Sequence, residues 1–81
     1  MKTTNRYSDL TSAKIEENLT PKKYEASPAM GNCPAIFKTD TGSYVLIGKA
    51  LSENEVKQLD IGGRVGDDEI VFQIPADLIK L

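Results

Sequence analysis

Residues 33–48 read CPAIFKTDTGSYVLIG and predict a complete β-hairpin. Residues 35–39 and 43–49 are rich in β-branched and aromatic side chains, which is typical of strands. Between them, Asp40 can bond forward to the backbone, and Gly42 can adopt the left-handed conformation at no steric cost. The hairpin indicates the fold class but supplies almost no chemistry.

A helix and a third strand follow the hairpin. Ser52 is the expected N-cap, and Glu55 three residues later completes a capping box. The glycines at 62–63 are expected to end this helix, and residues 69–74 form the next strand, which Pro75 ends because proline has no N–H to donate. The order β-β-α-β predicts an α+β fold, a small antiparallel sheet with one helix packed on it.

The N-terminal segment, residues 1–30, is polar and only weakly periodic. Thr11 or Ser12 is positioned to cap a short helix over residues 13–19. We expect two units, a flexible N-terminal arm over residues 1–30 and a small α+β domain over residues 31–81. The alternative to a flexible tail is an arm that becomes ordered on a partner or on its own domain.

The second strand of the hairpin is apolar on both faces. Val45 and Ile47 point one way while Tyr44 and Leu46 point the other, because side chains alternate along a strand. One short helix covers one face, so the other needs the N-terminal arm, the C-terminal residues Leu78, Ile79 and Leu81, or a second molecule. An exposed apolar patch usually marks a contact surface. We therefore predict an interaction surface made of Tyr44, Leu46, Ile36 and Val71, and either a dimer or a monomer with its arm docked.

Composition excludes several classes of site. The 81-residue chain has one cysteine and no histidine, so an internal disulfide is impossible, and the usual general base and zinc ligand is missing. We expect no catalytic residues, no metal and no cofactor. The lone cysteine suits a reducing cytoplasm, and no apolar run approaches the roughly 20 residues that span a bilayer. Residues 31–81 hold five basic and eight acidic side chains, which argues against binding of nucleic acid.

Cys33 and Pro34 have two interpretations. A Cys-Pro pair at the start of a strand resembles the short heme-responsive motif, in which the thiolate ligates iron. No cationic neighbour that would lower the thiol pKa is evident in the sequence. The simpler interpretation is a small, mostly buried thiol whose following proline sets the entry of the strand.

The hairpin also resembles a pattern found in small uncharacterised bacterial proteins. That pattern has a Cys-Pro pair, an apolar-aromatic step, Thr-Asp-x-Gly, and a valine-rich strand that ends in glycine. The segment EIVFQIPADLI at residues 69–79 resembles the end of the same group. Many members are actinobacterial accessories of transcription regulators. The resemblance covers about residues 33–81 and implies a small α+β protein without established catalytic residues.

We therefore expect a non-enzymatic interaction protein, an accessory to a transcription regulator, which acts through an apolar sheet face on a protein partner or on a second copy. One alternative comes from VFQIPADLIKL at residues 71–81, which is similar to the strand, Ile-Pro and helix step of swapped-hairpin antitoxins and transition-state regulators. Those proteins bind DNA as dimers. The other alternative is a Cys33-based heme or redox sensor.

Overall fold

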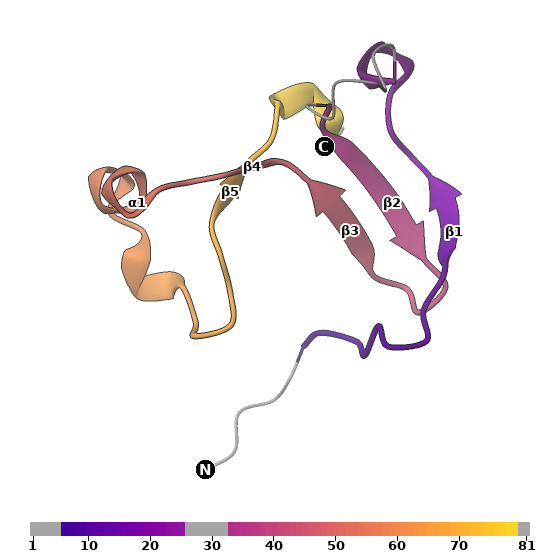
Figure 1. Cartoon of the computed structure of the whole chain (residues 1–81), viewed down its shortest axis with the longest axis horizontal. Helices are drawn as coiled ribbons and strands as arrows, with labels where there is room; N and C mark the ends of the chain where they lie inside the picture. The colour runs from indigo at the N-terminus through magenta and orange to yellow at the C-terminus, as the bar shows by residue number, and fades with distance from the viewer. Residues whose placement is uncertain (1–5, 26–32, 80–81) are drawn as a thin grey trace.

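The computed structural model describes residues 6–25 and 33–79 of the chain. A three-stranded antiparallel sheet has the order β1-β2-β3, formed by β1 (Ile15–Asn18), β2 (Ala35–Thr39) and β3 (Tyr44–Ile47). A two-stranded antiparallel sheet pairs β4 (Lys49–Ala50) with β5 (Phe72–Gln73), and the helix α1 (Glu53–Leu59) lies between them in sequence (Figure 1). The predicted α+β class with a small antiparallel sheet is confirmed.

The hairpin of β2 and β3 forms as predicted. Phe37 pairs with Val45 in an antiparallel register, and the turn is closed by a 2.9 Å bond from the Thr39 N–H to the Ser43 carbonyl. Gly42 has φ +90°, the left-handed conformation expected there. The Thr39 side chain is almost fully buried, and its hydroxyl lies 2.8 Å from that of Ser43. The turn residues therefore satisfy one another's hydrogen-bonding groups.

The predicted helix over residues 13–19 is wrong, because that segment contains strand β1. β1 pairs antiparallel with the free edge of β2, and the ladder is extended by bonds from the Leu19 N–H to the Ile36 carbonyl and from the Asp40 N–H to the Lys14 carbonyl. A helix here would have had few apolar contacts, whereas the unpaired edge of β2 supplies backbone hydrogen bonds. The predicted boundary between residues 30 and 31 lies outside the described residues.

The second predicted strand divides at Gly48 into β3 and β4. A Cβ atom at Gly48 would lie 2.5 Å from the Gln73 carbonyl oxygen and 2.7 Å from the Phe72 ring, so only glycine fits where β5 crosses. After Gly48, β4 pairs with β5 instead of continuing the three-stranded sheet. The third predicted strand, residues 69–74, is accordingly shortened to Phe72–Gln73.

Helix α1 begins as predicted and ends earlier than predicted. The Glu55 N–H donates to the Ser52 hydroxyl at 3.2 Å, and the Ser52 N–H donates to the Glu55 carboxylate at 2.8 Å, which completes the capping box. The helix ends at Asp60, which adopts the left-handed conformation at φ 59°. Gly62 begins the separate 3₁₀ turn η3 (Gly62–Arg64) instead of ending the helix.

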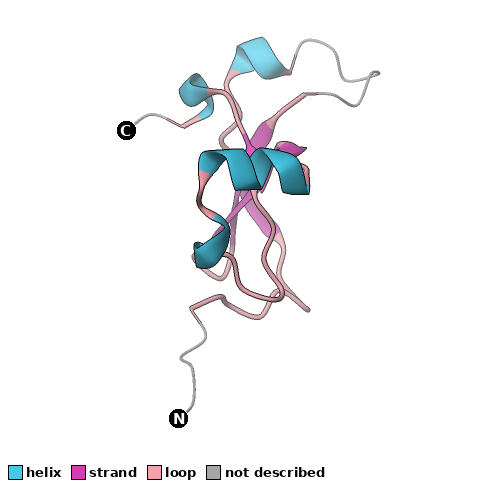
Figure 2. Ribbon diagram, turned by 90° about the vertical axis from the view of Figure 1, so that its left-hand side faces the viewer, coloured by secondary structure: helices cyan, strands magenta, loops and turns pink. Residues whose placement is uncertain are grey.

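The helix lies beside the two-stranded sheet and packs against η3, away from the three-stranded sheet (Figure 1). Viewed from the side of α1, the helix stands in front of the strands (Figure 2). Leu59 is 57% exposed and lines a cavity with Val71 and Phe72, so the helix faces the two-stranded sheet. The helix follows β4, and β4 pairs with β5 and not with a strand of the three-stranded sheet.

The end of the described chain returns to the three-stranded sheet. Pro75 precedes the 3₁₀ turn η4 (Ala76–Leu78). A second short turn, η1 (Lys22–Tyr24), follows β1. Among the described residues, the buried apolar side chains are Ile36 and Leu78, so the core is small. The described part of the chain contains no helix with the length and apolar character needed to cross a bilayer.

Candidate functional site

The register of the three-stranded sheet divides its side chains between two faces. Ile36 pairs with Leu46 and Lys38 with Tyr44, so these four share one face, which we call the groove face. Side chains at the alternate positions of these strands point to the opposite face, which we call the open face. Its large apolar members are Ile15, Phe37, Val45 and Ile47.

The groove face contains a cavity of about 480 Å³. Three of the four predicted interaction residues line it, namely Ile36, Tyr44 and Leu46. The remaining lining residues come from the segment after β1 and from the last described residues, and they are Leu19, Pro21, Leu78 and Ile79. The predicted alternative, that the chain's own ends cover this face, is therefore realised in part; Leu81 lies outside the described residues.

The exposed fraction of the side chains differs sharply between the floor and the rim of the groove. Leu78 is 3% exposed and Ile36 is 7% exposed, so the floor is closed. Tyr44 at the rim is 58% exposed, and Leu46 is half-buried. The chain ends therefore cover the centre of the face and leave its rim open to solvent.

Hydrogen bonds to the backbone of Ile36 fix the N-terminal wall of the groove. The Ile36 N–H donates to the Thr20 hydroxyl at 3.1 Å, and that hydroxyl lies 3.3 Å from the Ile36 carbonyl oxygen. The same carbonyl accepts the Leu19 N–H at 2.9 Å. These bonds hold Leu19 and Pro21 beside the edge of β2.

A clamp between η1 and η4 fixes the C-terminal wall. The Asp77 carboxylate accepts hydrogen bonds from the Lys23 ammonium and the Tyr24 hydroxyl. The Lys23 and Tyr24 donors lower the pKa of the Asp77 carboxyl below its ordinary value, because both bonds favour the charged form. The Lys23 nitrogen also lies 5.5 Å from the centre of the Tyr24 ring. The clamp keeps Leu78 over the sheet.

The fourth predicted residue, Val71, does not lie on the groove face. It lines a separate cavity of about 600 Å³ between α1 and β5, together with Leu51, Leu59 and Ile61 among others. The split at Gly48 explains this separation, because β5 pairs with β4 and not with β3. The predicted interaction surface therefore divides, with three residues together and one in the other part of the molecule.

Sequence reasoning missed the open face as an uncovered surface, because the helix was expected to cover it. Ile15 is 53% exposed and Ile47 is 52% exposed, while Phe37 and Val45 are half-buried. Ile15 belongs to the segment that was expected to be helical, so its place on this face had no sequence signal. The alternation of residues 43–49 did indicate Val45 and Ile47.

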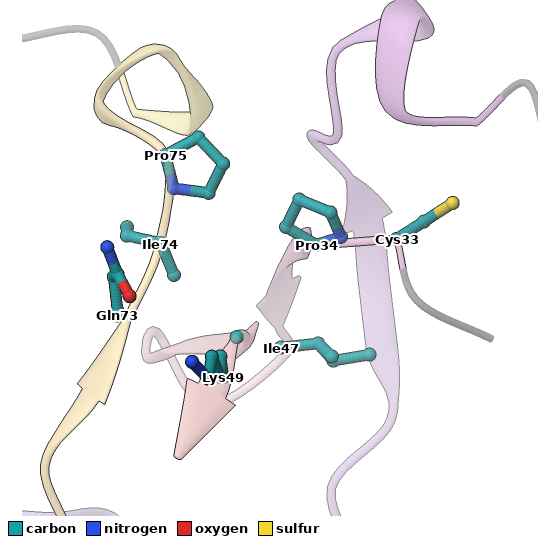
Figure 3. Close-up of a pocket in the computed structure, with 8 residues that line it drawn as sticks. Cys33, Pro34, Ile47, Lys49, Gln73, Ile74 and Pro75 are labelled. Carbon is teal, nitrogen blue, oxygen red and sulfur yellow. The ribbon is translucent and has the colours of Figure 1, made fainter. Parts of the chain in front are cut away.

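Cys33 lies at the entrance of β2, near a cavity of about 390 Å³ that is bounded by Pro34 and Pro75 among other residues. In Figure 3 the sulfur of Cys33 points away from Ile74 and Pro75 on the far side of that cavity. No cluster of three or more histidine, cysteine, aspartate or glutamate side chains suited to a metal ion occurs in residues 6–25 and 33–79. The cavity is lined by two isoleucines and two prolines together with Cys33, Gly48, Lys49 and Gln73.

Comparison with known protein families, with characterised proteins and with solved structures finds no match to this chain.

Proposed function

We propose that this protein is a non-enzymatic interaction protein that binds a protein partner through the groove face. The observation that carries the proposal is the groove itself, with a closed apolar floor and Tyr44 exposed at its rim. Tyrosine is enriched among the residues that dominate the energetics of protein interfaces. The class of partner that the sequence resemblance suggests is a transcription regulator.

The groove suits an apolar side chain from the partner. A volume of about 480 Å³ lies within the range of small-molecule and side-chain pockets. Complete burial of one leucine- or phenylalanine-sized side chain contributes roughly 1.5–3 kcal/mol. Tyr44 can pack its ring against that side chain and keep its hydroxyl in water, as tyrosine does at interfaces.

Charged and polar groups surround the apolar floor. Lys38 lies beside Tyr44 in the register, and its ammonium is 3.8 Å from the Glu16 carboxylate. The clamp of Lys23, Tyr24 and Asp77 borders the other side. An apolar centre with a polar rim is the usual anatomy of a protein interface.

The test compares what wild-type protein and groove variants retain from a lysate of the native host. Tyr44→Asp, alone and with Leu46→Asp, should lose a specific partner that wild-type protein retains. Ile47→Asp on the open face serves as the matched control, because it adds the same charge to the same strand and should retain the partner. Circular dichroism checks that each variant folds, and the single Tyr44→Asp variant is informative even where the double variant unfolds.

The purified partner then has to bind wild-type protein in isothermal titration and bind Tyr44→Asp at least tenfold more weakly. Equal binding by the two proteins would place the interaction elsewhere and overturn the proposal.

A further inference from the structure

We propose that the partner of the groove face binds as an extended segment, which adds a strand to the outer side of β3. We call this side, opposite β2, the β3 edge. The inference rests on the proposed function, because Tyr44 and Leu46 belong both to this edge and to the lining of the groove. It goes further by specifying the backbone conformation of the partner.

The hydrogen-bond pattern of the sheet determines which backbone groups reach the β3 edge. In an antiparallel pair, residues that exchange backbone hydrogen bonds alternate with residues that do not. The Thr39 N–H donates to the Ser43 carbonyl at 2.9 Å, so Val45, two residues on, also bonds to β2. The N–H and C=O groups of the residues on either side of it, Tyr44 and Leu46, therefore point away from β2. Among the described residues, no strand pairs with this side of β3.

The two outer strands of the three-stranded sheet differ in charge and in regularity. β1 carries Glu16 and Glu17, and its register with β2 shifts between Ile15 and Glu17, as at a β-bulge. Charged side chains and bulges are usual means by which an edge strand avoids pairing with another chain. β3 reads YVLI, with no charge and no proline, and its register with β2 is regular. The sheet is therefore protected from further pairing at β1 and accessible to it at β3.

The surroundings of the β3 edge favour a single strand over a second folded sheet. The unit of β4, β5 and α1 lies on the same side of β3 as this edge in Figure 1, and Figure 2 shows α1 in front of the strands from that side. A second copy that paired sheet to sheet would meet this unit, whereas one added strand needs about 4.8 Å of width. A cavity of about 390 Å³ lies between the Gly48 end of β3 and residues 73–75. The occupant that fits is an extended segment of another protein.

The chemistry of the edge specifies the segment. Its backbone is extended, because a strand presents N–H and C=O groups at the spacing of those of Tyr44 and Leu46. Its alternate side chains lie beside these two residues on the groove face, where cross-strand neighbours pack in pairs. Apolar side chains at those positions bury surface against Tyr44, which is 58% exposed. The expected segment has apolar side chains at every second position and no proline at its bonded residues.

Phage-displayed random linear peptides, selected on the full wild-type chain, test the proposal. The selected peptides should show apolar side chains at every second position. They should bind at least tenfold more weakly to a chain in which the Leu46 amide is N-methylated, because the methyl group removes the outward N–H and keeps the side chain. Chemical ligation at Cys33 allows this chain to be assembled.

N-methylation of the Asn18 amide is the matched control. The next N–H, that of Leu19, bonds to the Ile36 carbonyl on β2, so the Asn18 amide points outward from β1. This chain should bind the selected peptides as wild-type protein does. Circular dichroism checks the fold of both N-methylated chains.

Hydrogen exchange on wild-type protein gives a second measurement that needs no N-methylated chain. A bound peptide should slow exchange of the Tyr44 and Leu46 amides at least tenfold, and should change exchange of the Val45 amide much less, because that amide already bonds to β2. Failure to select any peptide, equal binding by wild-type protein and the chain with N-methylated Leu46, or unchanged exchange at Tyr44 and Leu46 would overturn the proposal.

The outcomes separate this inference from the proposed function. If Tyr44→Asp loses the partner from the lysate while the chain with N-methylated Leu46 keeps it, the groove face binds without strand addition and only the present inference fails. Ile47→Asp remains a control for both, because Ile47 points away from Gln73, Ile74 and Pro75 (Figure 3). A dimer in sedimentation equilibrium that N-methylation of Leu46 dissociates would make a second copy the occupant and would also overturn the inference.

Discussion

The groove face and the open face belong to the same three strands and are both apolar, but only the groove face is covered by the chain itself. Leu19 arrives from β1 and Leu78 from η4, and together they close the centre of the groove. The helix, which was expected to cover the open face, lies beside the two-stranded sheet of β4 and β5 (Figure 1). Coverage of a sheet therefore depends on the path of the connections, and a helix next in sequence is not necessarily next in space.

The largest expected effect comes from uncovering the groove face. Leu78→Ala removes most of the least exposed apolar side chain among the described residues and leaves a cavity under η4. We expect a loss of about 2–5 kcal/mol in the free energy of unfolding, which is comparable to the roughly 3–5 kcal/mol that a domain of this size possesses. Urea denaturation followed by circular dichroism measures the loss.

The control for this experiment is Leu59→Ala, because Leu59 is exposed on α1 and belongs to neither face. That change should alter the free energy of unfolding by less than about 0.5 kcal/mol. Equal losses for the two variants would mean that Leu78 does not cover the groove face in solution.

The next effect comes from the close contact between Gly48 and β5, where the chain passes from the three-stranded sheet to the two-stranded sheet. Gly48→Ala places a Cβ atom within 3 Å of the Gln73 carbonyl and the Phe72 ring. The resulting displacement of β5 should destabilise the protein by about 1–3 kcal/mol, the usual cost of overpacking. Hydrogen exchange of the Lys49 and Ala50 amides should accelerate more than exchange in β2.

Gly63→Ala is the matched control, since a Cβ atom there meets nothing within 4 Å and the residue has no positive φ. It should be neutral or slightly stabilising. Destabilisation by Gly63→Ala as large as that by Gly48→Ala would contradict the explanation based on close contact at β5.

A smaller effect is expected from the N-cap of helix α1, which lies away from both faces of the three-stranded sheet. Ser52→Ala removes the hydroxyl that accepts the Glu55 N–H and should cost about 1 kcal/mol in the free energy of unfolding. Ser52→Gly should cost only a few tenths of that amount. Equal losses for Ser52→Ala and Ser52→Gly would contradict the role of the Ser52 hydroxyl as the helix cap.

Sequence patterns predicted the local elements that depend on nearby residues. The hairpin turn at Gly42 and the capping box of Ser52 and Glu55 formed as expected, because each is determined by residues within five positions of one another. The α+β class follows from these elements. The grouping of Ile36, Tyr44 and Leu46 followed from alternation along two paired strands.

Long-range pairing could not be predicted in the same way. Residues 15–18 form a strand because the edge of β2 lies free beside them, and their own sequence, IEEN, carries no strand pattern. Gly48 ended a predicted strand for a reason that lies in β5, more than twenty residues later. Val71 lies away from the groove face for the same reason, because β5 pairs with β4 and not with β3.

The smallest expected effect concerns the clamp that holds η4 over the groove face. Because the pKa of the Asp77 carboxyl is lower in the folded chain than its ordinary value, the clamp stabilises the fold above that ordinary value and is lost as pH falls through the lower folded value. Stability should therefore decrease with acidification below about pH 4, and Asp77→Asn should reduce this decrease while lowering stability at neutral pH. Urea denaturation at several pH values measures both effects, with Asp60→Asn as a control at a carboxylate outside the clamp. Identical pH profiles for wild-type protein and Asp77→Asn would mean that the clamp contributes nothing to covering the groove face, and Leu78 would then be held by its apolar contacts alone.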